Sequence, residues 1–476
     1  MGIVTQLGAR ERVVRLLDDN SFVEIGGMIH ARNTDFNMNT KETPADGVIT
    51  GYGTINGKLV YVYSQDGSVM KGSIGEMHAN KIVRIYDMAL KMGAPVIGLI
   101  DCAGMRLQEA TDALNAFGGI FYKQTMASGV IPQINGIFGN CGGGMAIVPS
   151  LADFTFIVDK QGELFVNSPD ALEGNRRENC NTAAAGFRGQ VVGDVSGAGA
   201  DESEVLDKIR HLITLLPSNN KEDALCMEDV QDDLNRENPS LGDTRDVSYI
   251  LEDISDAHEF FEVRPDYGTE VVTGFMLLNG NTVGAVANKE KSDGESVLTA
   301  AAAMKAEAFI RFCDAFSIPV LTLVNVQGFK ATVDEEKRIA PAAAKLTYAY
   351  ASATVPKVSV VIGKAFGSAY LCMGSRHVGT DMVYAWPTAQ IGMMNAEAAV
   401  KIIYADEIEA SEARNELISE KAEAYESLQN SPEGAASRGY VDGIIEAAST
   451  RKRVIAAFEM LMTKRENIPD RKHGTV

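Results

Sequence analysis

The residues that most directly suggest chemistry are three adjacent glycines, Gly142, Gly143 and Gly144, between two apolar runs. The run 134–138 is typical of a buried strand and the run 145–149 of the first turn of a buried helix, so the glycines lie where a strand passes into a helix. Amide groups at the start of a helix have no partner within it, and glycine lets a ligand oxygen come close to them. The pattern suits a phosphate or an oxyanion, although a tight turn or close helix packing would need the same residues.

The chain contains an internal repeat that gives these glycines a counterpart. A constant offset in numbering (305 minus 81 gives 224) aligns the two halves: Lys81 with Lys305, Pro95 with Pro319, Asp101 with Asn325, Gly104 with Gly328, Arg106 with Lys330, Pro132 with Pro356, Gly139 with Gly363 and Gly143 with Gly367. A hairpin signal at Asn56 and Gly57 returns at Asn279 and Gly280, one residue out of step. The halves are therefore copies of one unit of alternating strands and helices.

Each copy presents two loops at the ends of expected strands. The first half has Gly104 and Met105 with Gly143 and Gly144, and the second has Gly328 and Phe329 with Gly367 and Ser368. The spacing of the loops is the same in both halves (143 minus 104 and 367 minus 328 both give 39), and it leaves room for one helix and one strand. Both loops of a half can then lie at one sheet edge, where two converging N–H groups would form an oxyanion hole.

Several elements must position these loops. Helical spacing marks 8–17, 72–92 and 110–128, a strand is expected at 96–100, and 51–63 is typical of a hairpin. The segment 217–247, rich in Asn, Asp and Glu, is the expected connection. We predict an N-terminal domain over 1–240 and a C-terminal domain over 241–476.

Composition excludes several classes of function. The 476 residues carry a formal net charge of -20, which argues against binding to nucleic acid or to an anionic membrane surface. The chain shows neither a signal peptide nor an apolar run of about 18 residues, so a cytoplasmic protein is expected. The cysteines form no CxxC pair and the histidines show no ligand spacing, so we expect no metal site. Cys102 and Cys141 are expected to be small buried hydrophobes rather than nucleophiles.

Short motifs over nearly the whole chain carry a family resemblance: 9–12, 21–24, 46–48, 72–76, 128–134, 312–316, 353–357, 384–389 and 472–474. Together they resemble the carboxyltransferase component of biotin-dependent acyl-CoA carboxylases and decarboxylases. That family includes the propionyl-CoA carboxylase β subunit, the transcarboxylase large subunit and the methylmalonyl-CoA decarboxylase α subunit. The resemblance implies an α/β fold of two tandem crotonase-like (ClpP/crotonase superfamily) domains related by internal duplication.

The resemblance also implies an activity. The first domain would bind acyl-CoA and the second biotin, and a carboxyl group would move between carrier-bound biotin and the α carbon of a short-chain acyl-CoA (propionyl-CoA/methylmalonyl-CoA or acetyl-CoA/malonyl-CoA). Negative charge would develop on the thioester oxygen and on the biotin ureido oxygen, one for each hole. By position, backbone amides of Met105, Gly143 and Gly144 would hold the first oxygen, and those of Phe329, Gly367, Ser368 and Ala369 the second.

Further substrate-binding residues are expected around these loops: Lys71, Gly72, Gly104, Arg106, Gly328, Tyr370 and Leu371. Lys71 and Arg106 could offer positive charge to CoA phosphates, although either could equally lie at the surface or in an ion pair. Leu371 replaces the Asp usual in the family near the acyl pocket, which puts propionyl-CoA as the sole substrate in doubt. Lys305 follows Ala303 and Met304 as in a biotin attachment site, but the pattern there is helical, so biotin would arrive on a separate carrier.

The family implies a biotin carboxyl carrier protein, and a biotin carboxylase or a membrane decarboxylase subunit, as partners. It also implies a homo-oligomer, a hexamer arranged as a trimer of dimers, with active sites between domains of two subunits. One alternative is the α subunit of a sodium-pumping acyl-CoA decarboxylase. Another is a crotonase-type hydratase or hydrolase, which needs a pair of carboxylates beside the thioester hole. Glu76 and Glu109 are near in sequence, but nothing in the sequence pairs them. A third alternative is a noncatalytic scaffold.

Overall fold

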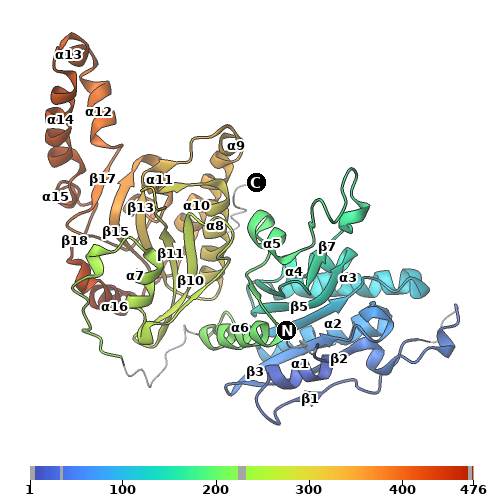
Figure 1. Ribbon diagram of the computed structural model, residues 1–476. Coiled ribbons are helices and arrows are strands. Elements are labelled where there is room, and N and C mark those ends of the chain that lie inside the picture. The colour runs from blue at the N-terminus through green and yellow to red at the C-terminus, as the bar shows by residue number, and fades with distance from the viewer. Residues whose placement is uncertain (1–5, 33–35, 223–231, 470–473, 475–476) are drawn as a thin grey trace. The chain divides into compact units, whose positions relative to one another are not determined.

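The computed structural model describes residues 6–32, 36–222, 232–469 and 474. The chain forms two compact units, Met1–Asp223 and Ala224–Val476, which are described separately (Figure 1). Residues 223–231 of the expected connection, and Lys472 and His473 of the C-terminal motif, lie outside the described residues. No helix in the described ranges is long and apolar enough to cross a membrane.

The first unit is built on an eight-stranded sheet in the order β1-β2-β3-β4-β5-β6-β8, with β7 beside β5. The strands are β1 (Val23–Glu24), β2 (Val48–Ile55), β3 (Lys58–Gln65), β4 (Val96–Cys102), β5 (Gln133–Gly142), β6 (Phe154–Val158), β7 (Glu163–Phe165) and β8 (Gly197–Gly199). Strands β1 to β3 are antiparallel, and the pairs from β3 onward are parallel. The loops that follow β4 and β5 therefore lie at the same sheet edge.

Helices cover both faces of this sheet. They are α1 (Ala9–Leu16), α2 (Glu76–Met92), α3 (Ala110–Ala127), α4 (Ile147–Leu151), α5 (Ala185–Phe187) and α6 (Glu202–Leu215). Ile137 of β5 packs in one core with α2 and α3, whereas its neighbour Gly136 faces Ile209 of α6. Successive strand residues point to opposite faces, so α6 and the pair α2 and α3 lie on opposite sides. Helix α2 begins four residues later than expected, because Met70, Lys71 and Gly72 have positive φ angles of 48°, 57° and 63°.

The second unit repeats this sheet in the order β18-β16-β15-β13-β11-β10-β9, with β17 beside β15. Its strands are β9 (Phe260–Glu262), β10 (Val271–Leu278), β11 (Asn281–Asn288), β13 (Val320–Val326), β15 (Lys357–Phe366), β16 (Met382–Ala385), β17 (Gln390–Gly392) and β18 (Gly443–Ile444), and a separate pair joins β12 (Val297–Leu298) to β14 (Gly328–Phe329). Both ends of β13 match those of β4 at the predicted offset (320 minus 96 and 326 minus 102), and both ends of β15 match those of β5 at the same offset. The predicted internal duplication is confirmed strand by strand.

Helices again cover both faces of the second sheet. They are α7 (Val247–Ile254), α8 (Ala300–Ala315), α9 (Val333–Glu336), α10 (Ile339–Ser352), α11 (Gly367–Cys372) and α16 (Thr450–Leu461). Val283 and Ala285 pack with α7 and α16, whereas Gly284 between them faces Cys313 and Phe309 of α8. Lys305 lies within α8, is buried, and donates to the carbonyl oxygen of Val271 at 2.7 Å. That position excludes Lys305 as an exposed biotin attachment site.

Each unit fixes its β-hairpin turn with a carboxylate that an arginine holds. In the first unit, Asp18 accepts the amide hydrogens of Asn56 and Gly57 at 3.0 and 2.9 Å, and Arg210 donates to it at 3.0 Å. This turn lies at the sheet edge opposite the glycine loops. It precedes β3, which runs parallel to β4, whereas the glycine loops follow the ends of β4 and β5.

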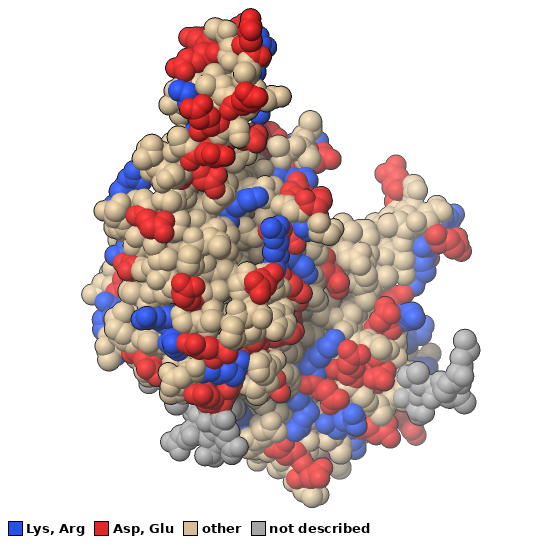
Figure 2. Space-filling model, turned by 60° about the vertical axis from the view of Figure 1, so that its left-hand side comes forward, with Lys and Arg blue, Asp and Glu red and all other residues tan. Residues whose placement is uncertain are grey.

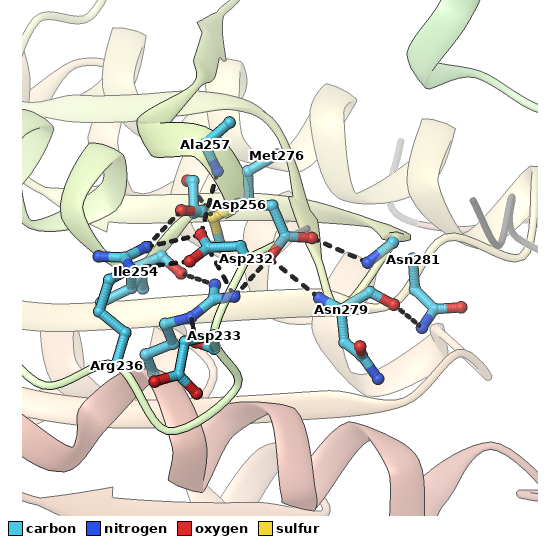
Figure 3. Close-up of polar contacts among 12 residues, drawn as sticks. Asp232, Asp233, Arg236, Ile254, Asp256, Ala257, Met276, Asn279 and Asn281 are labelled. Carbon is cyan, nitrogen blue, oxygen red and sulfur yellow. Dashed lines mark hydrogen bonds and ion pairs between the residues drawn. The ribbon is translucent and has the colours of Figure 1, made fainter. Parts of the chain in front are cut away.

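The second unit buries its version of this clamp. Asp256 accepts the amide hydrogens of Asn279 and Gly280 at 3.2 and 2.8 Å, and Arg451, which is 2% exposed, donates to it at 2.6 Å. Figure 3 shows Asp232 and Arg236 beside Asp256 in the same cluster. The cluster ties residues just after 231 to the second unit.

A helical arm between β17 and β18 has no counterpart in the first unit, and sequence analysis did not predict it. It consists of α12 (Ala396–Ile403), α13 (Ala405–Ala410), α14 (Arg414–Tyr425) and α15 (Pro432–Ser437), and it extends away from the second sheet (Figure 1). A small core of Ala396, Val400 and Ala422 holds α12 to α14. Acidic side chains are spread over the arm's surface (Figure 2).

Candidate functional site

Strands β4 and β5 bend just before the loops that they carry. Their parallel pairing runs evenly as far as Ile100 and resumes at Cys102 opposite Cys141, so β5 has two extra residues there. Asp101 lies in this bend, and a Cβ built on Gly139 would be 2.2 Å from its Oδ1 atom. Gly139 is therefore required by the close approach of Asp101. Burial raises the pKa of that carboxyl group.

The second unit repeats the bend with an amide in place of the carboxylate. Asn325 Oδ1 accepts the amide hydrogen of Lys364 at 3.0 Å and would lie 2.6 Å from a Cβ on Gly363. The pairs at 101 and 139 and at 325 and 363 thus shape the strand ends. A packing role accounts for these repeated glycines without a ligand.

The two loops of the first unit meet. A Cβ built on Gly104, whose φ angle is 117°, would lie 3.4 Å from the carbonyl oxygen of Gly142. Gly143 has a φ angle of 63°, and a Cβ there would meet nothing within 4 Å, so the space over it is open. Gly143 and Gly144 begin the short helix η5 (Gly143–Ala146), which has no side-chain cap. Their amide hydrogens are therefore not used by the helix.

Met105 presents a further amide at this place. Ile74 donates its N–H to the carbonyl oxygen of Gly104 at 2.9 Å and accepts the N–H of Arg106 at 2.8 Å. In a parallel bridge of this kind, the residue between the two bonded neighbours turns its own N–H away from the partner segment. The N–H of Met105 thus points away from Ile74, and the residue is 40% exposed.

The first loop of the second unit has the same backbone arrangement. Strand β14, formed by Gly328 and Phe329, pairs in parallel with β12, and Lys330 donates its N–H to the carbonyl oxygen of Leu298 at 3.0 Å. Phe329 and Leu298 are the counterparts of Met105 and Ile74 in the repeat (329 minus 105 equals 298 minus 74). The N–H of Phe329 therefore also points away from its partner segment.

The second loop of that unit begins helix α11, which lies against β14. Gly367 has a φ angle of 60°, and its preceding residue Phe366 offers no side-chain cap. The first three amide hydrogens, those of Gly367, Ser368 and Ala369, have no acceptor within the helix. The residues predicted to hold a second oxyanion thus lie together in one unit.

Lys71 and Gly72 stand beside the first loop. The carbonyl oxygen of Lys71 accepts the N–H of Ala103 at 3.0 Å, and the Lys71 side chain is exposed. A Cβ on Gly72 would lie 2.0 Å from the carbonyl oxygen of Asp101, so only glycine fits. Lys71 is thereby placed where its ammonium group faces solvent next to the Gly104 loop.

Arg106 is buried, in contrast to Lys71. Its side chain is inaccessible to solvent and forms ion pairs with Asp46 at 2.6 Å and Glu109 at 2.7 Å, and it donates to the carbonyl oxygen of Ser73 at 2.9 Å. The sequence left open whether Arg106 contacts a phosphate, lies at the surface or forms an ion pair, and the structure shows the ion pair. We assign no phosphate contact to Arg106.

Tyr370 and Leu371 follow the second hole on α11. Tyr370 is 4% exposed, and its hydroxyl group has no hydrogen-bond partner among the described residues. Burial raises the pKa of Tyr370 to about 12, so the hydroxyl group remains a proton donor. Leu371 is 40% exposed and adds an apolar side chain at the surface.

Side chains that could replace the amides in catalysis are engaged or inert. Burial raises the pKa of the Cys102 thiol to about 12 and that of Cys141 well above its ordinary value, so neither is a thiolate at neutral pH. Glu109 is held by its ion pair, and the Glu76 carboxylate pairs with Arg32 at 2.5 Å. The described residues contain no group of three or more His, Cys, Asp or Glu that could hold a metal ion.

Sequence reasoning missed two residues of this neighbourhood. Asp46 was part of a matching motif without an assigned role, and Glu109 was considered only as a partner for Glu76. The spacing of Arg106 and Glu109, three residues apart, was a usable signal for their ion pair. No local pattern indicated the contact with Asp46, which lies 60 residues away.

Comparison with known proteins places this geometry in a family. Residues 5–476 match the carboxyl transferase domain. The chain is 41% identical over 483 residues to methylmalonyl-CoA decarboxylase subunit alpha of Veillonella parvula, covering 99% of this chain and 93% of the relative. It is also 41% identical over 486 residues to the propionyl-CoA carboxylase carboxyltransferase subunit of Haloferax mediterranei, with the same coverage.

A solved structure agrees with both units. The crystal structure of transcarboxylase 12S, a hexamer with methylmalonyl-CoA and methylmalonic acid bound, matches with a TM-score of 0.93 and 38% identity, covering 98% of this chain and 92% of that one. The match confirms the predicted fold of two tandem crotonase-like domains and the predicted family resemblance. The chain is an enzyme and belongs to the carboxyl transferase family.

Proposed function

We propose that this chain transfers a carboxyl group between biotin and the α carbon of a short-chain acyl-CoA, through one backbone oxyanion hole in each half. The observation that carries the proposal is the repetition of two loop pairs, each with amide hydrogens that the adjoining helix does not use. Two anionic oxygens arise in such a transfer, and two holes in one duplicated chain match that number.

The first hole would hold the thioester oxygen. Amides of Met105, Gly143 and Gly144 would donate to it as negative charge develops, and the open space over Gly143 leaves room for that oxygen. Lys71, exposed beside the same loop, would meet a phosphate of the CoA moiety. No side-chain base is assigned, because Glu76 and Glu109 are both held in ion pairs. This engagement also weakens the case for a hydratase.

The second hole would hold the ureido oxygen of biotin. Biotin, when bound there, would carry the carboxyl group. The residues present fit such a group: amides of Phe329, Gly367, Ser368 and Ala369 are donors, and the buried Tyr370 hydroxyl group lacks a partner among the described residues. Because Lys305 is buried within α8, biotin would come on a separate carrier protein.

The family resemblance implies how the enzyme works in the cell. A carrier protein, and either a biotin carboxylase or a membrane decarboxylase subunit, would be its partners in the cytoplasm. Its assembly would be a homohexamer, a trimer of dimers, and transcarboxylase 12S is also a hexamer. The domains would run over 1–240 for acyl-CoA and 241–476 for biotin. Methylmalonyl-CoA and propionyl-CoA are the proposed acyl pair.

A second candidate is the α subunit of a sodium-pumping decarboxylase. Leu371 supports it, because the family resemblance implies an apolar residue at this position in the decarboxylase branch and Asp in other members. One relative is also a methylmalonyl-CoA decarboxylase subunit. The carboxyltransferase half-reaction is the same in both cases. The partner subunits decide between them, and co-purification from the native cell with a membrane subunit would favour the pump.

The proposal is tested with the purified chain, methylmalonyl-CoA and free biotin. We expect CO2 release that depends on biotin, measured with and without it. Turnover that proceeds equally without biotin would contradict carboxyl transfer and favour a hydrolase. Absence of turnover with methylmalonyl-CoA and with malonyl-CoA would favour a noncatalytic scaffold.

A further inference from the structure

A buried charged cluster of the first unit that the mechanism does not use lies directly behind the proposed thioester hole. Arg106 follows Met105 in the chain, and its side chain is shielded from solvent together with the carboxylates of Asp46 and Glu109. Each carboxylate uses one oxygen for Arg106. The cluster therefore joins two segments, because Asp46 lies 60 residues before Arg106 whereas Glu109 lies three residues after it.

The other oxygen of each carboxylate holds the start of helix α2. Glu109 Oε2 accepts the N–H of Glu76 at 2.7 Å, and Asp46 Oδ2 accepts the N–H of His78 at 2.8 Å. Amides in the first turn of a helix need such acceptors, and negative charge is favourable there. Arg106 thus fixes the helix start through two carboxylates.

The same cluster fixes the backbone of the loop. Ile74, just before α2, binds Gly104 and Arg106 through its N–H and carbonyl groups, and Met105 lies between them. Arg106 adds a side-chain bond to the carbonyl oxygen of Ser73. The direction of the Met105 N–H therefore depends on a segment that Arg106 holds from both sides.

The second unit lacks this buried device at the matching position. Lys330 is the counterpart of Arg106 in the repeat, and it pairs with Glu295 at 2.6 Å, with both side chains about one-third exposed. Glu335 does accept the N–H of Ala300 at 2.7 Å, as Glu109 does for Glu76. Only the first loop is held by a buried guanidinium with two carboxylates, among the residues that the structure describes.

We propose that Arg106, with Asp46 and Glu109, is a positioning residue for carboxyl transfer, which sets the Met105 N–H toward the thioester oxygen. The inference rests on the proposed function, because it takes the Met105 amide as a donor in the first hole. A hole works only when its donors meet the oxygen at hydrogen-bond distance, and a displacement of about 1 Å can lower the rate about a hundredfold. Loosening the cluster should therefore reduce kcat while binding of the CoA moiety persists.

The test compares Arg106→Gln with Arg451→Gln in biotin-dependent decarboxylation of methylmalonyl-CoA. Arg451 is a matched control, since it is also a buried arginine paired with a carboxylate, but that carboxylate, Asp256, holds the hairpin turn at the far edge of the other sheet. We expect Arg106→Gln to lower kcat about thirtyfold to a hundredfold, with KM within threefold of wild type. Arg106→Lys should have a kcat between that of Arg106→Gln and that of wild type. Arg451→Gln should keep the wild-type kcat when measured below its melting temperature.

A second variant keeps the test decisive if Arg106→Gln fails to fold. Glu109→Gln removes one charge and retains a carbonyl oxygen for the N–H of Glu76, and the same fall in kcat is expected. Wild-type kcat in a folded Arg106 or Glu109 variant overturns the inference, as does an equal loss in Arg451→Gln. Failure of the proposed function looks different, because the wild-type enzyme itself would then turn over without biotin or show no turnover.

Discussion

Replacing Gly143 with alanine separates a catalytic role of this loop from a purely structural one. Gly143 has a φ angle of 63° and open space where a Cβ would stand. The substitution therefore meets no clash. It lowers stability only because alanine is less favourable than glycine in the left-handed conformation, by about 1–2 kcal/mol, or roughly 2–8 °C in Tm for a domain of this size. The added methyl group would occupy the space that we assign to the thioester oxygen. Disturbing one donor of an oxyanion hole lowers kcat about 100-fold to 1,000-fold.

Gly57→Ala is the matched control. Gly57 lies in the β2–β3 turn with a φ angle of 78° and also has no atom within 4 Å of a built Cβ. Both variants should lose similar stability in thermal unfolding, while only Gly143→Ala should lose kcat in biotin-dependent decarboxylation. If Gly143→Ala retains a kcat within threefold of Gly57→Ala, the glycine serves only the turn and the first hole loses its central support.

Three further predictions concern single side chains of the first unit. Lys71→Glu should raise KM for acyl-CoA about tenfold with little change in kcat, since it removes one charged phosphate contact, and an unchanged KM would show that Lys71 is only a surface residue. A thiol reagent at pH 8 should leave Cys102 and Cys141 unmodified in the folded enzyme, as mass spectrometry of peptides can show, because burial raises the pKa of both thiols; modification of either in the native state would contradict this. Burial raises the pKa of Asp153 to about 7, above its unfolded value of 3.8, so the stability that this group contributes is lost as pH rises between those values. The Tm of Asp153→Asn minus the Tm of wild type should therefore increase from pH 4 to pH 8. A Tm difference that stays constant over this range would refute the raised pKa of Asp153.

The sequence was sufficient to predict the internal repeat, the two hairpin turns and the strands that carry the glycine loops. The turns at Asn56 and Asn279 are local signals, and each strand after them is marked by an apolar run. The constant offset between the halves transfers β4 and β5 onto β13 and β15 without error. Strand β5 nevertheless continues to Gly142, beyond its expected end, because Gly139 is dictated by Asp101 from another strand and does not break the strand.

Long-range contacts explain what the sequence did not reveal. An arginine in an acidic chain suggested an anionic ligand, but Asp46, 60 residues away, satisfies Arg106 instead. The helical arm was missed because the prediction relied on the repeat, and the first half has no matching set of helices at this place. Locations of Met105 and Phe329 could be predicted from the repeat, whereas the direction of their amides follows from pairing with Ile74 and Leu298.

The central claim is that separate backbone amides in each half receive the two anionic oxygens. A crystal structure of the enzyme with methylmalonyl-CoA measures the first half of that claim directly. We predict a thioester oxygen within about 2.7–3.1 Å of the backbone nitrogen of Met105 and of Gly143 or Gly144. A thioester oxygen bound instead by a side chain, or lying against Gly367 on α11, would contradict the assignment.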